Sequence, residues 1–344
     1  MALTPEKIEE ISYQVIKTLY KRFETFPADP SGIRNAPFHM AFLRAFQDKL
    51  EEHVTDIPVF ISLSSWFHGL NTTLGQSFFE NVSHILCDGM KREFKTLKIS
   101  QTQQTTVTDI VTDLKNNTHV PNLARENGLI YQNNTPQDKE VSNFTADCYF
   151  EDNEKIVAIE LKTVKPNSGV FKNEKDKMLS AKAGLKNANA AKEIFFYLAF
   201  PFDPLSLTPT GSDKTGFMNY SVDFTKFFAA NEVLLADELW NFLSGDTNTM
   251  QQIIDIINAI ASPQFMDKYN FLNDAHNRTA HRVEYVQQLT EWKLFSEVRL
   301  VENETLLLQR IANNKRMIRK FNQPMFKEED YNIERFIALE PFLH

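Results

Sequence analysis

Glycine and cysteine are both scarce in this chain of 344 residues. Only ten residues are glycine, and neither G-x-G-x-x-G nor G-x-x-x-x-G-K-[ST] occurs, which argues against Rossmann-type dinucleotide binding and against P-loop nucleotide hydrolysis. The two cysteines, Cys87 and Cys148, cannot form a disulfide framework and are too few for a Cys-rich zinc site. The function must therefore depend on other residue types.

Long apolar runs are missing as well. The longest, Ile194 to Phe202, is about half of the roughly 20 residues that a membrane-spanning helix needs. The first twenty residues carry acids and lack the apolar segment of a secretion signal. We therefore expect a soluble protein of a reducing, cytoplasmic compartment, with no membrane partner.

Apolar periodicity predicts three consecutive regions, in a chain long enough for roughly two domains of about 150 residues. Residues 1–70 are expected to be helical, with helices over 5–23 and 37–54. Residues 71–204 are expected to form a mixed α/β core. Residues 205–344 are expected to be mainly helical and packed on that core.

Helices and strands are both expected in the core region. They are a helix over 74–94, an Asn- and Gln-rich loop over 116–142, strands over 143–150 and 155–163, a Lys-rich helix over 173–191 and a buried strand over 194–200. The first two strands flank turn residues 151–154, so we expect them to form an antiparallel hairpin. The predicted fold class is α/β, a mixed sheet flanked by helices.

Three charged residues are expected on one face of this hairpin. With the turn centred on residues 152–153, Asp147 lies opposite Ala158. Glu160 is then its diagonal neighbour on the same face, with alpha carbons about 7 to 8 Å apart. Lys162 lies two residues further along the strand and points the same way.

These residue types together suit phosphodiester hydrolysis. Carboxylates of Asp147 and Glu160, with a backbone carbonyl such as that of Leu161, form an oxygen set suited to Mg²⁺. The ammonium of Lys162 can orient or deprotonate the attacking water, or neutralise charge on the phosphorus. An alternative stays open: the pattern E/D-x-K occurs four times in the chain, and an exposed hairpin face can carry ordinary surface charges.

The spacing of these residues resembles a known nuclease motif. Asp147, twelve intervening residues and then Glu160-Leu161-Lys162 resemble PD-(D/E)xK, with Ala146 in place of the proline. The segments around 160–169 and 182–187 resemble, more narrowly, a family of type II restriction endonucleases associated with interrupted palindromes of the GGNCC kind.

That resemblance implies a PD-(D/E)xK restriction-endonuclease-like core with helical additions at both ends. It also implies that Asp147 and Glu160 hold Mg²⁺ and that Lys162 is catalytic. Many of these nucleases place a glutamate on the helix before the sheet, and Glu80 is the candidate in this chain. The alternative for Glu80 is an ordinary solvated helix face.

Positive charge is concentrated beside the motif. Residues 155–192 hold nine lysines against three acids, although the whole chain carries a net charge of −8. The predicted DNA contacts are Lys165, Asn167, Ser168, Lys175, Lys182 and Lys186. A second basic run, from Arg310 to Lys327, contains no acid. Each run could instead be a solvated helix face.

The sequence therefore predicts a Mg²⁺-dependent endonuclease that cuts double-stranded DNA at a short sequence. A palindromic target is most directly matched by a homodimer, and a cognate DNA methyltransferase is an expected functional partner. Two alternatives remain: a nuclease of DNA repair or recombination with the same motif, and a catalytically idle DNA-binding module of the same fold.

Overall fold

The computed structural model describes residues 3–27, 57–163 and 168–343, which belong to two compact units. The first unit consists of Met1–Leu3 and Phe79–Ile253, and the second of Thr4–Phe78 and Ile254–His344. The units do not follow the three consecutive regions expected at 1–70, 71–204 and 205–344, because each unit is assembled from segments that are distant in sequence. The helix expected over 37–54 lies outside the described residues.

The first unit alternates between helices and strands. Its elements are α5 (Phe79–Cys87), β1 (Met90–Phe94), β2 (Lys98–Ile99), α6 (Gln101–Lys115), α7 (Leu123–Ile130), β3 (Lys139–Glu140), β4 (Phe144–Glu151), β5 (Lys155–Leu161), α8 (Ser168–Ala188), β6 (Glu193–Phe200), α9 (Lys214–Tyr220), α10 (Phe224–Phe227), η4 (Ala230–Glu232), β7 (Val233–Leu235), α11 (Asp237–Ser244) and the start of α12 (Thr249–Ile260). Strands β2 and β3 form a small sheet of their own.

The main sheet has five strands in the order β1-β4-β5-β6-β7. The pairs β1–β4 and β4–β5 are antiparallel, whereas the pairs β5–β6 and β6–β7 are parallel. The sheet is therefore mixed and has helices on it, which confirms the predicted α/β class. Strand β5 is central, and residues 156–161 are all buried.

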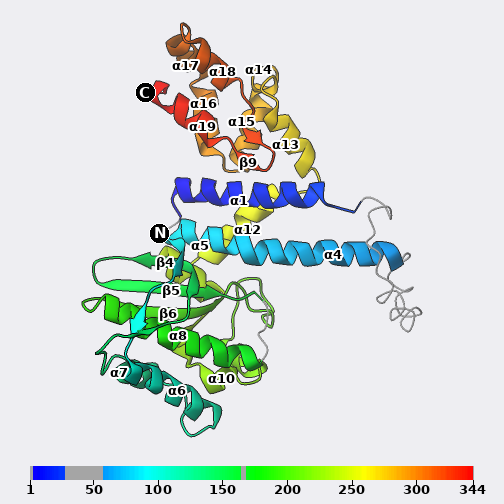
Figure 1. The fold of residues 1–344 in the computed structure, drawn as a ribbon. Helices are drawn as coiled ribbons and strands as arrows, with labels where there is room; N and C mark the ends of the chain where they lie inside the picture. The colour runs from blue at the N-terminus through cyan, green and yellow to red at the C-terminus, as the bar shows by residue number, and fades with distance from the viewer. Residues whose placement is uncertain (1–2, 28–56, 164–167, 344) are drawn as a thin grey trace. The chain divides into compact units, whose positions relative to one another are not determined.

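The two faces of β5 contact different helices. Cys148 of β4 pairs with Ile159, and its Sγ lies 3.4 Å from Sγ of Cys87 on α5. Glu160 points to the other face and contacts Lys177 of α8. Helix α8 lies along the sheet, with α6 and α7 packed against it on its outer side (Figure 1).

The observed elements of the first unit differ from the expected ones at several points. The helix expected over 74–94 ends at Cys87, and its last residues form strand β1. The chain reverses at Asp88, whose φ is 53°, and Gly89 approaches β4 so closely that a Cβ would lie 2.8 Å from the carbonyl oxygen of Tyr149. The loop expected over 116–142 contains helix α7 and strand β3, and strand β7 was not predicted.

A buried group of charges ties α8 to its neighbours. Lys175 is fully buried, and its Nζ lies 2.5 Å from Oε2 of Glu126 on α7 and 2.7 Å from Oε1 of Glu232 in η4. Lys182, two turns further along α8, is 1% exposed. Burial lowers the pKa of Lys182 to about 8, although the nearby Glu232 opposes that change.

The second unit is mainly helical. Its elements are α1 (Pro5–Glu24), α4 (Ile57–Thr73), the π-helix η3 (Leu74–Phe78), the end of α12, α13 (Phe265–Asn273), α14 (Asn277–Ala280), α15 (Arg282–Glu291), α16 (Phe295–Glu302), α17 (Glu304–Ile311), α18 (Lys315–Phe321), β8 (Phe326–Lys327), β9 (Asp330–Tyr331), α19 (Ile333–Leu339) and η5 (Glu340–Phe342).

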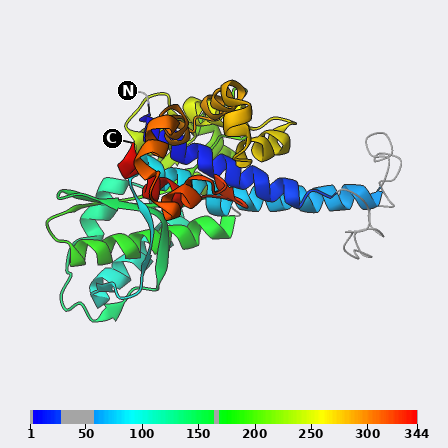
Figure 2. The ribbon, with the colours of Figure 1, turned by 90° about the horizontal axis from the view of Figure 1, so that it is seen from above.

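Helices α1 and α4 lie side by side (Figures 1 and 2). The side chain of Thr4 caps α1 by accepting a hydrogen bond from the amide of Lys7, and Pro5 follows at the first helical position. Nε1 of Trp66 on α4 donates to the carbonyl oxygen of Arg22 on α1 (3.0 Å). Within the described residues, no helix combines the length and apolar character that crossing a bilayer requires.

The buried lysines of α8 predict opposite effects of the same substitution. Lys175→Met leaves Glu126 and Glu232 buried without their cation, so the free energy of unfolding should fall by about 3–5 kcal/mol. Lys182→Met removes a cation that burial disfavours, so the free energy of unfolding should rise at pH 7, by up to about 3 kcal/mol. Urea unfolding of each variant and of wild type measures the two changes in the free energy of unfolding.

The pH dependence provides the control. As pH rises from about 8 towards the ordinary lysine pKa, wild-type Lys182 loses its proton in the folded state before the unfolded state does. Wild-type stability therefore rises relative to Lys182→Met, and the advantage of the variant should shrink. If the extra stability of Lys182→Met over wild type stays constant from pH 7 to 10, the lowered pKa of Lys182 is contradicted.

Candidate active site

The β4–β5 hairpin turns one residue later than the sequence predicted. The amide of Asp152 donates to the carbonyl oxygen of Lys155 (3.0 Å), so the two residues of the turn are Asn153 and Glu154. The cause is the Asp152 side chain, whose Oδ1 accepts hydrogen bonds from the amides of Glu154 (2.8 Å) and Lys155 (2.9 Å). Asp152 therefore flanks the turn instead of occupying it.

This register sets the two predicted metal-binding carboxylates across from each other. Cys148 pairs with Ile159, and the next positions on the two strands are Asp147 and Glu160. The predicted pairing of Asp147 with Ala158 is wrong by two residues. Because side chains alternate with a period of two, each one still points to its predicted face. Asp147 and Glu160 are thus direct rather than diagonal neighbours.

The Asp147 carboxylate is mostly buried, with 18% of its side chain exposed. Its Oδ2 accepts a hydrogen bond from the amide of Leu161 (2.9 Å). Burial raises the pKa of this carboxyl, and the hydrogen bond from Leu161 only partly opposes that rise. A carboxylate in this situation is stabilised by a nearby positive charge. The role expected for the carbonyl oxygen of Leu161 stays a prediction.

Glu160 belongs to a network of two carboxylates and two ammonium groups. Its Oε1 lies 2.8 Å from Nζ of Lys162, and its Oε2 lies 2.6 Å from Nζ of Lys177. Both lysines also contact Glu174 of α8, at 2.8 Å from Lys162 and 3.3 Å from Lys177. Burial disfavours the charged form of Lys162, but Glu160 and Glu174 outweigh burial and raise the pKa of its ammonium.

Glu80 on α5 is joined to this site by Lys91 of β1. Nζ of Lys91 lies 2.9 Å from Oε2 of Glu80 and 3.7 Å from Oδ1 of Asp147. The hydrogen bond to Glu80 is the main reason that the pKa of Lys91 is raised. His84, one turn further along α5, contacts the backbone oxygen of Asp147 through Nε2 (2.7 Å). Helix α5 is thus attached to β4 at Asp147.

A pocket of about 430 Å³ lies beside these charges. It is lined by Lys91, Glu93, Asn143, Phe144, Thr145, Asp147, Glu160 and Lys177. One open space therefore lies in front of the carboxylates of Asp147 and Glu160 and the ammonium groups of Lys91 and Lys177.

A hard divalent cation fits this donor set. Asp147 and Glu160 offer carboxylate oxygens, which suit Mg²⁺ better than a metal that prefers thiolate or imidazole ligands. Each carboxylate has a lysine ammonium within 3.7 Å, which balances its negative charge. No three His, Cys, Asp or Glu side chains converge as a metal site among the described residues, but Mg²⁺ usually needs only one or two carboxylates besides water and substrate.

Comparison with known proteins assigns the chain to a family. The family described as "Type II restriction endonuclease, HinfI" matches residues 4–261. The chain belongs to this family of restriction endonucleases. It is also 41% identical to "Type II restriction enzyme MjaII" of Methanocaldococcus jannaschii, over 97% of this chain and 96% of that protein. No solved structure matches the chain. Of the three functions considered from the sequence, restriction is thus the one that the relatives support.

Three members of the restriction endonuclease's charged site were not among the predicted residues. They are Lys91, Glu174 and Lys177. Lys91 was missed because it falls within the helix expected over 74–94. Glu174 and Lys177 were counted only towards the charge of the Lys-rich segment. Their separation of three residues, which puts two helical side chains on the same side, was the available signal.

The predicted DNA contacts on α8 need correction. Lys175 and Lys182 are buried inside the first unit, so the prediction that they contact phosphates is wrong. Nζ of Lys186 donates to the carbonyl oxygens of Ala190 and Lys192, both at 2.8 Å, and its contact with DNA stays a prediction. The other three candidates are Lys165 and Asn167, which lie outside the described residues, and Ser168, which begins α8.

The site predicts which substitutions abolish cleavage. Glu160→Gln keeps the size of the side chain but removes the negative charge that faces Lys162 and Lys177, and the cleavage rate should fall by at least about 100-fold. Asp147→Asn and Lys162→Met should have effects of similar size. Rates of plasmid linearisation measure the loss, and circular dichroism checks the fold.

Glu151→Gln is the matched control. Glu151 lies on β4, the strand next to that of Glu160, and pairs with a lysine, Lys192, at 2.7 Å, but it does not line the pocket. This variant should cut plasmid at the wild-type rate. Wild-type cleavage by Glu160→Gln would show that the site lies elsewhere.

Proposed function

We propose that this type II restriction endonuclease hydrolyses phosphodiester bonds of double-stranded DNA at a short palindrome, using Mg²⁺. Restriction endonucleases generally use divalent metal ions, and the choice of Mg²⁺ is our own assignment from the oxygen ligands. The observation that supports it most is that Asp147 and Glu160 line one pocket, with Lys162 bonded to Glu160. These are the residues of the PD-(D/E)xK pattern.

In this proposal Asp147 and Glu160 hold the metal through carboxylate oxygens, with the carbonyl oxygen of Leu161 as a further ligand. When bound, Mg²⁺ supplies Lewis acidity towards the phosphoryl oxygens and lowers the pKa of a bound water. The lysines at 2.6 to 3.7 Å from these carboxylates limit the net negative charge of the site, so that a phosphate can approach it.

Lys162 acts on the substrate rather than on the metal. An ammonium cannot be a metal ligand, and contacts to both Glu160 and Glu174 restrict its position. We assign it to the attacking water, which it orients, and to the negative charge that develops on phosphoryl oxygens, which it neutralises. Glu174 is then a positioning residue for Lys162.

Two further assignments extend the site. Glu80 is a fourth acidic group, which is linked to Asp147 through Lys91. DNA contacts are assigned to Lys165, Asn167 and Ser168, which follow the motif directly in the sequence, and to Lys186 at the end of α8.

The assembly follows from the symmetry of the substrate. One Asp147–Glu160–Lys162 set per chain has to cut two antiparallel strands, and a C₂ dimer places a second set at the symmetric position. We propose a homodimer on an interrupted palindrome of the GGNCC kind. A cognate DNA methyltransferase would protect the same sequence in the host cytoplasm.

The assignment of Mg²⁺ predicts that Mg²⁺ and Ca²⁺ have different effects on cleavage. Mg²⁺ should support cutting, whereas Ca²⁺ should support specific DNA binding without turnover, because the larger ion is coordinated more loosely and positions water poorly. Plasmid digestion and gel-shift binding with each ion measure the two properties. Full cleavage with chelator alone would contradict metal dependence.

The symmetric assembly predicts the positions of the cuts. Run-off sequencing of digested plasmid should reveal one cut on each strand, at equivalent positions within a palindrome that has an unspecified centre. Light scattering of the complex with a single duplex should give the mass of two chains. Cuts at a fixed distance to one side of an asymmetric site, or a complex with one chain, would contradict the dimer.

A further inference from the structure

Helix α18 has two chemically different sides. At about 100° per residue, the apolar side chains of Met317, Ile318 and Phe321 fall on one side of the helix. The cations are on the other side. They are Lys315, Arg316, Arg319 and Lys320.

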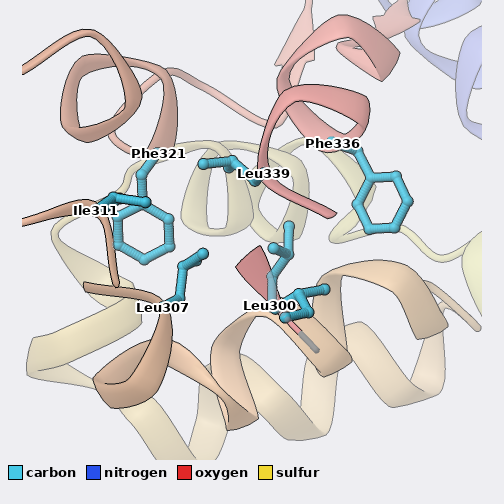
Figure 3. Packing of buried hydrophobic residues seen from close by; sticks show 7 residues of the cluster. Leu300, Leu307, Ile311, Phe321, Phe336 and Leu339 are labelled. Atoms are coloured by element: carbon cyan, nitrogen blue, oxygen red, sulfur yellow. The ribbon is translucent and has the colours of Figure 1, made fainter. Parts of the chain in front are cut away.

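The apolar side of α18 is fixed to the second unit. Phe321 belongs to a buried cluster, and Met317 and Ile318 pack against it. The cluster consists of Leu300, Leu307, Ile311, Phe321, Phe336, Leu339 and Leu343 (Figure 3). These residues come from α16, α17, α18, α19 and the segment after α19. The helix therefore cannot rotate its cations inward without exposing this cluster.

Two buried arginines hold the C-terminal end of α18. Nη1 of Arg278 donates to the carbonyl oxygen of Phe321 (3.1 Å), and its guanidinium lies 3.7 Å from the centre of the Phe321 ring. Nη2 of Arg335 lies 3.5 Å from the same carbonyl oxygen. Each arginine has its own acid, Glu304 for Arg278 and Glu297 for Arg335. These cations are structural, so they are distinct from the exposed ones.

Lys320 of α18 lies 3.7 Å from Glu334, but the other three cations of the helix lack the acidic partners that other cations of this unit have. Lys17, Lys21 and Lys268 pair with acids at 2.7 to 2.9 Å. Lys315, Arg316 and Arg319 are exposed, and none forms an ion pair with a described residue. Residues 308–327 contain six cations and no acid, in a chain whose net charge is −8.

We propose that the face of α18 formed by Lys315, Arg316 and Arg319 binds the phosphate backbone of duplex DNA. Unpaired cations on a fixed helix suit a regular polyanion such as DNA. They can bind phosphates and release counterions from the DNA without first breaking an ion pair with an acidic residue of the protein. The surface lies beyond residues 4–261, the part that matches the family. It is also separate in sequence from every residue of the carboxylate pocket. The inference rests on the proposed function, since it adds a second contact to the same substrate.

The test compares two triple variants that change the net charge equally. One is Lys315→Gln, Arg316→Gln and Arg319→Gln. The control is Lys17→Gln, Lys21→Gln and Lys268→Gln, which removes three paired cations of the same unit. Binding of the full chain to a fluorescein-labelled duplex without a cleavage site is followed by anisotropy, in EDTA, from 50 to 200 mM NaCl.

The expected result is a change in salt dependence for one variant only. Each lost phosphate contact lowers the slope of log affinity against log salt by about 0.9, so the α18 variant should lose nearly three units. Between 50 and 200 mM NaCl its affinity should fall about 40-fold less than that of wild type. The control should keep the wild-type slope. If the triple variant unfolds by circular dichroism, Arg319→Gln alone should lower the slope by about one.

Three outcomes would overturn the inference. They are a wild-type slope for the α18 variant, an equal change in both triple variants, and a substitution on α18 that changes which plasmid sequence is cut. The last would mean that the helix contacts bases. A failure of the proposed function would give a different result. If the α18 variant loses salt dependence but the wild-type chain never cuts plasmid, the nuclease proposal alone is contradicted.

Discussion

The site depends on the pairing of β4 with β5. Side chains alternate along a strand, so only even shifts of register keep two carboxylates on the same face. Asp152 determines the register by accepting two backbone hydrogen bonds at the turn, and Asp147 then lies across from Glu160. A shift by one residue would send one of the two carboxylates to the face that α5 covers. The turn therefore determines where the two carboxylates lie, although it is several residues away from them.

Burial of charge is the second constraint on the molecule. Helix α8 carries several lysines, and packing divides them into groups with different roles. Lys175 lies in the interior with Glu126 and Glu232, Lys177 contacts Glu160, and Lys186 donates to carbonyl oxygens near the end of the helix. A buried ammonium must be paired or lose its proton more readily, whereas a half-exposed one can stabilise an acidic site.

The two units use arginine and lysine differently. In the second unit, Arg278 and Arg335 are buried and paired with acids, and each one donates a hydrogen bond to the carbonyl oxygen of Phe321 on α18. In the first unit, lysines surround the acids of the site. A lysine has a single charged atom on a flexible stem, so it can yield its place near a carboxylate more easily than a bidentate arginine.

The sequence by itself determined the mixed α/β class, the hairpin and the faces of Asp147, Glu160 and Lys162, because strand alternation and turn chemistry are local properties. It did not determine the register, since one side chain, Asp152, decides between two turns of similar composition. It also could not separate Lys175 and Lys182 from exposed lysines. Lys175 is buried against Glu126 and Glu232, which are distant in sequence. Only the tertiary structure brought Lys91, Glu174 and Lys177 to the carboxylates, because such contacts join elements whose packing no local pattern encodes.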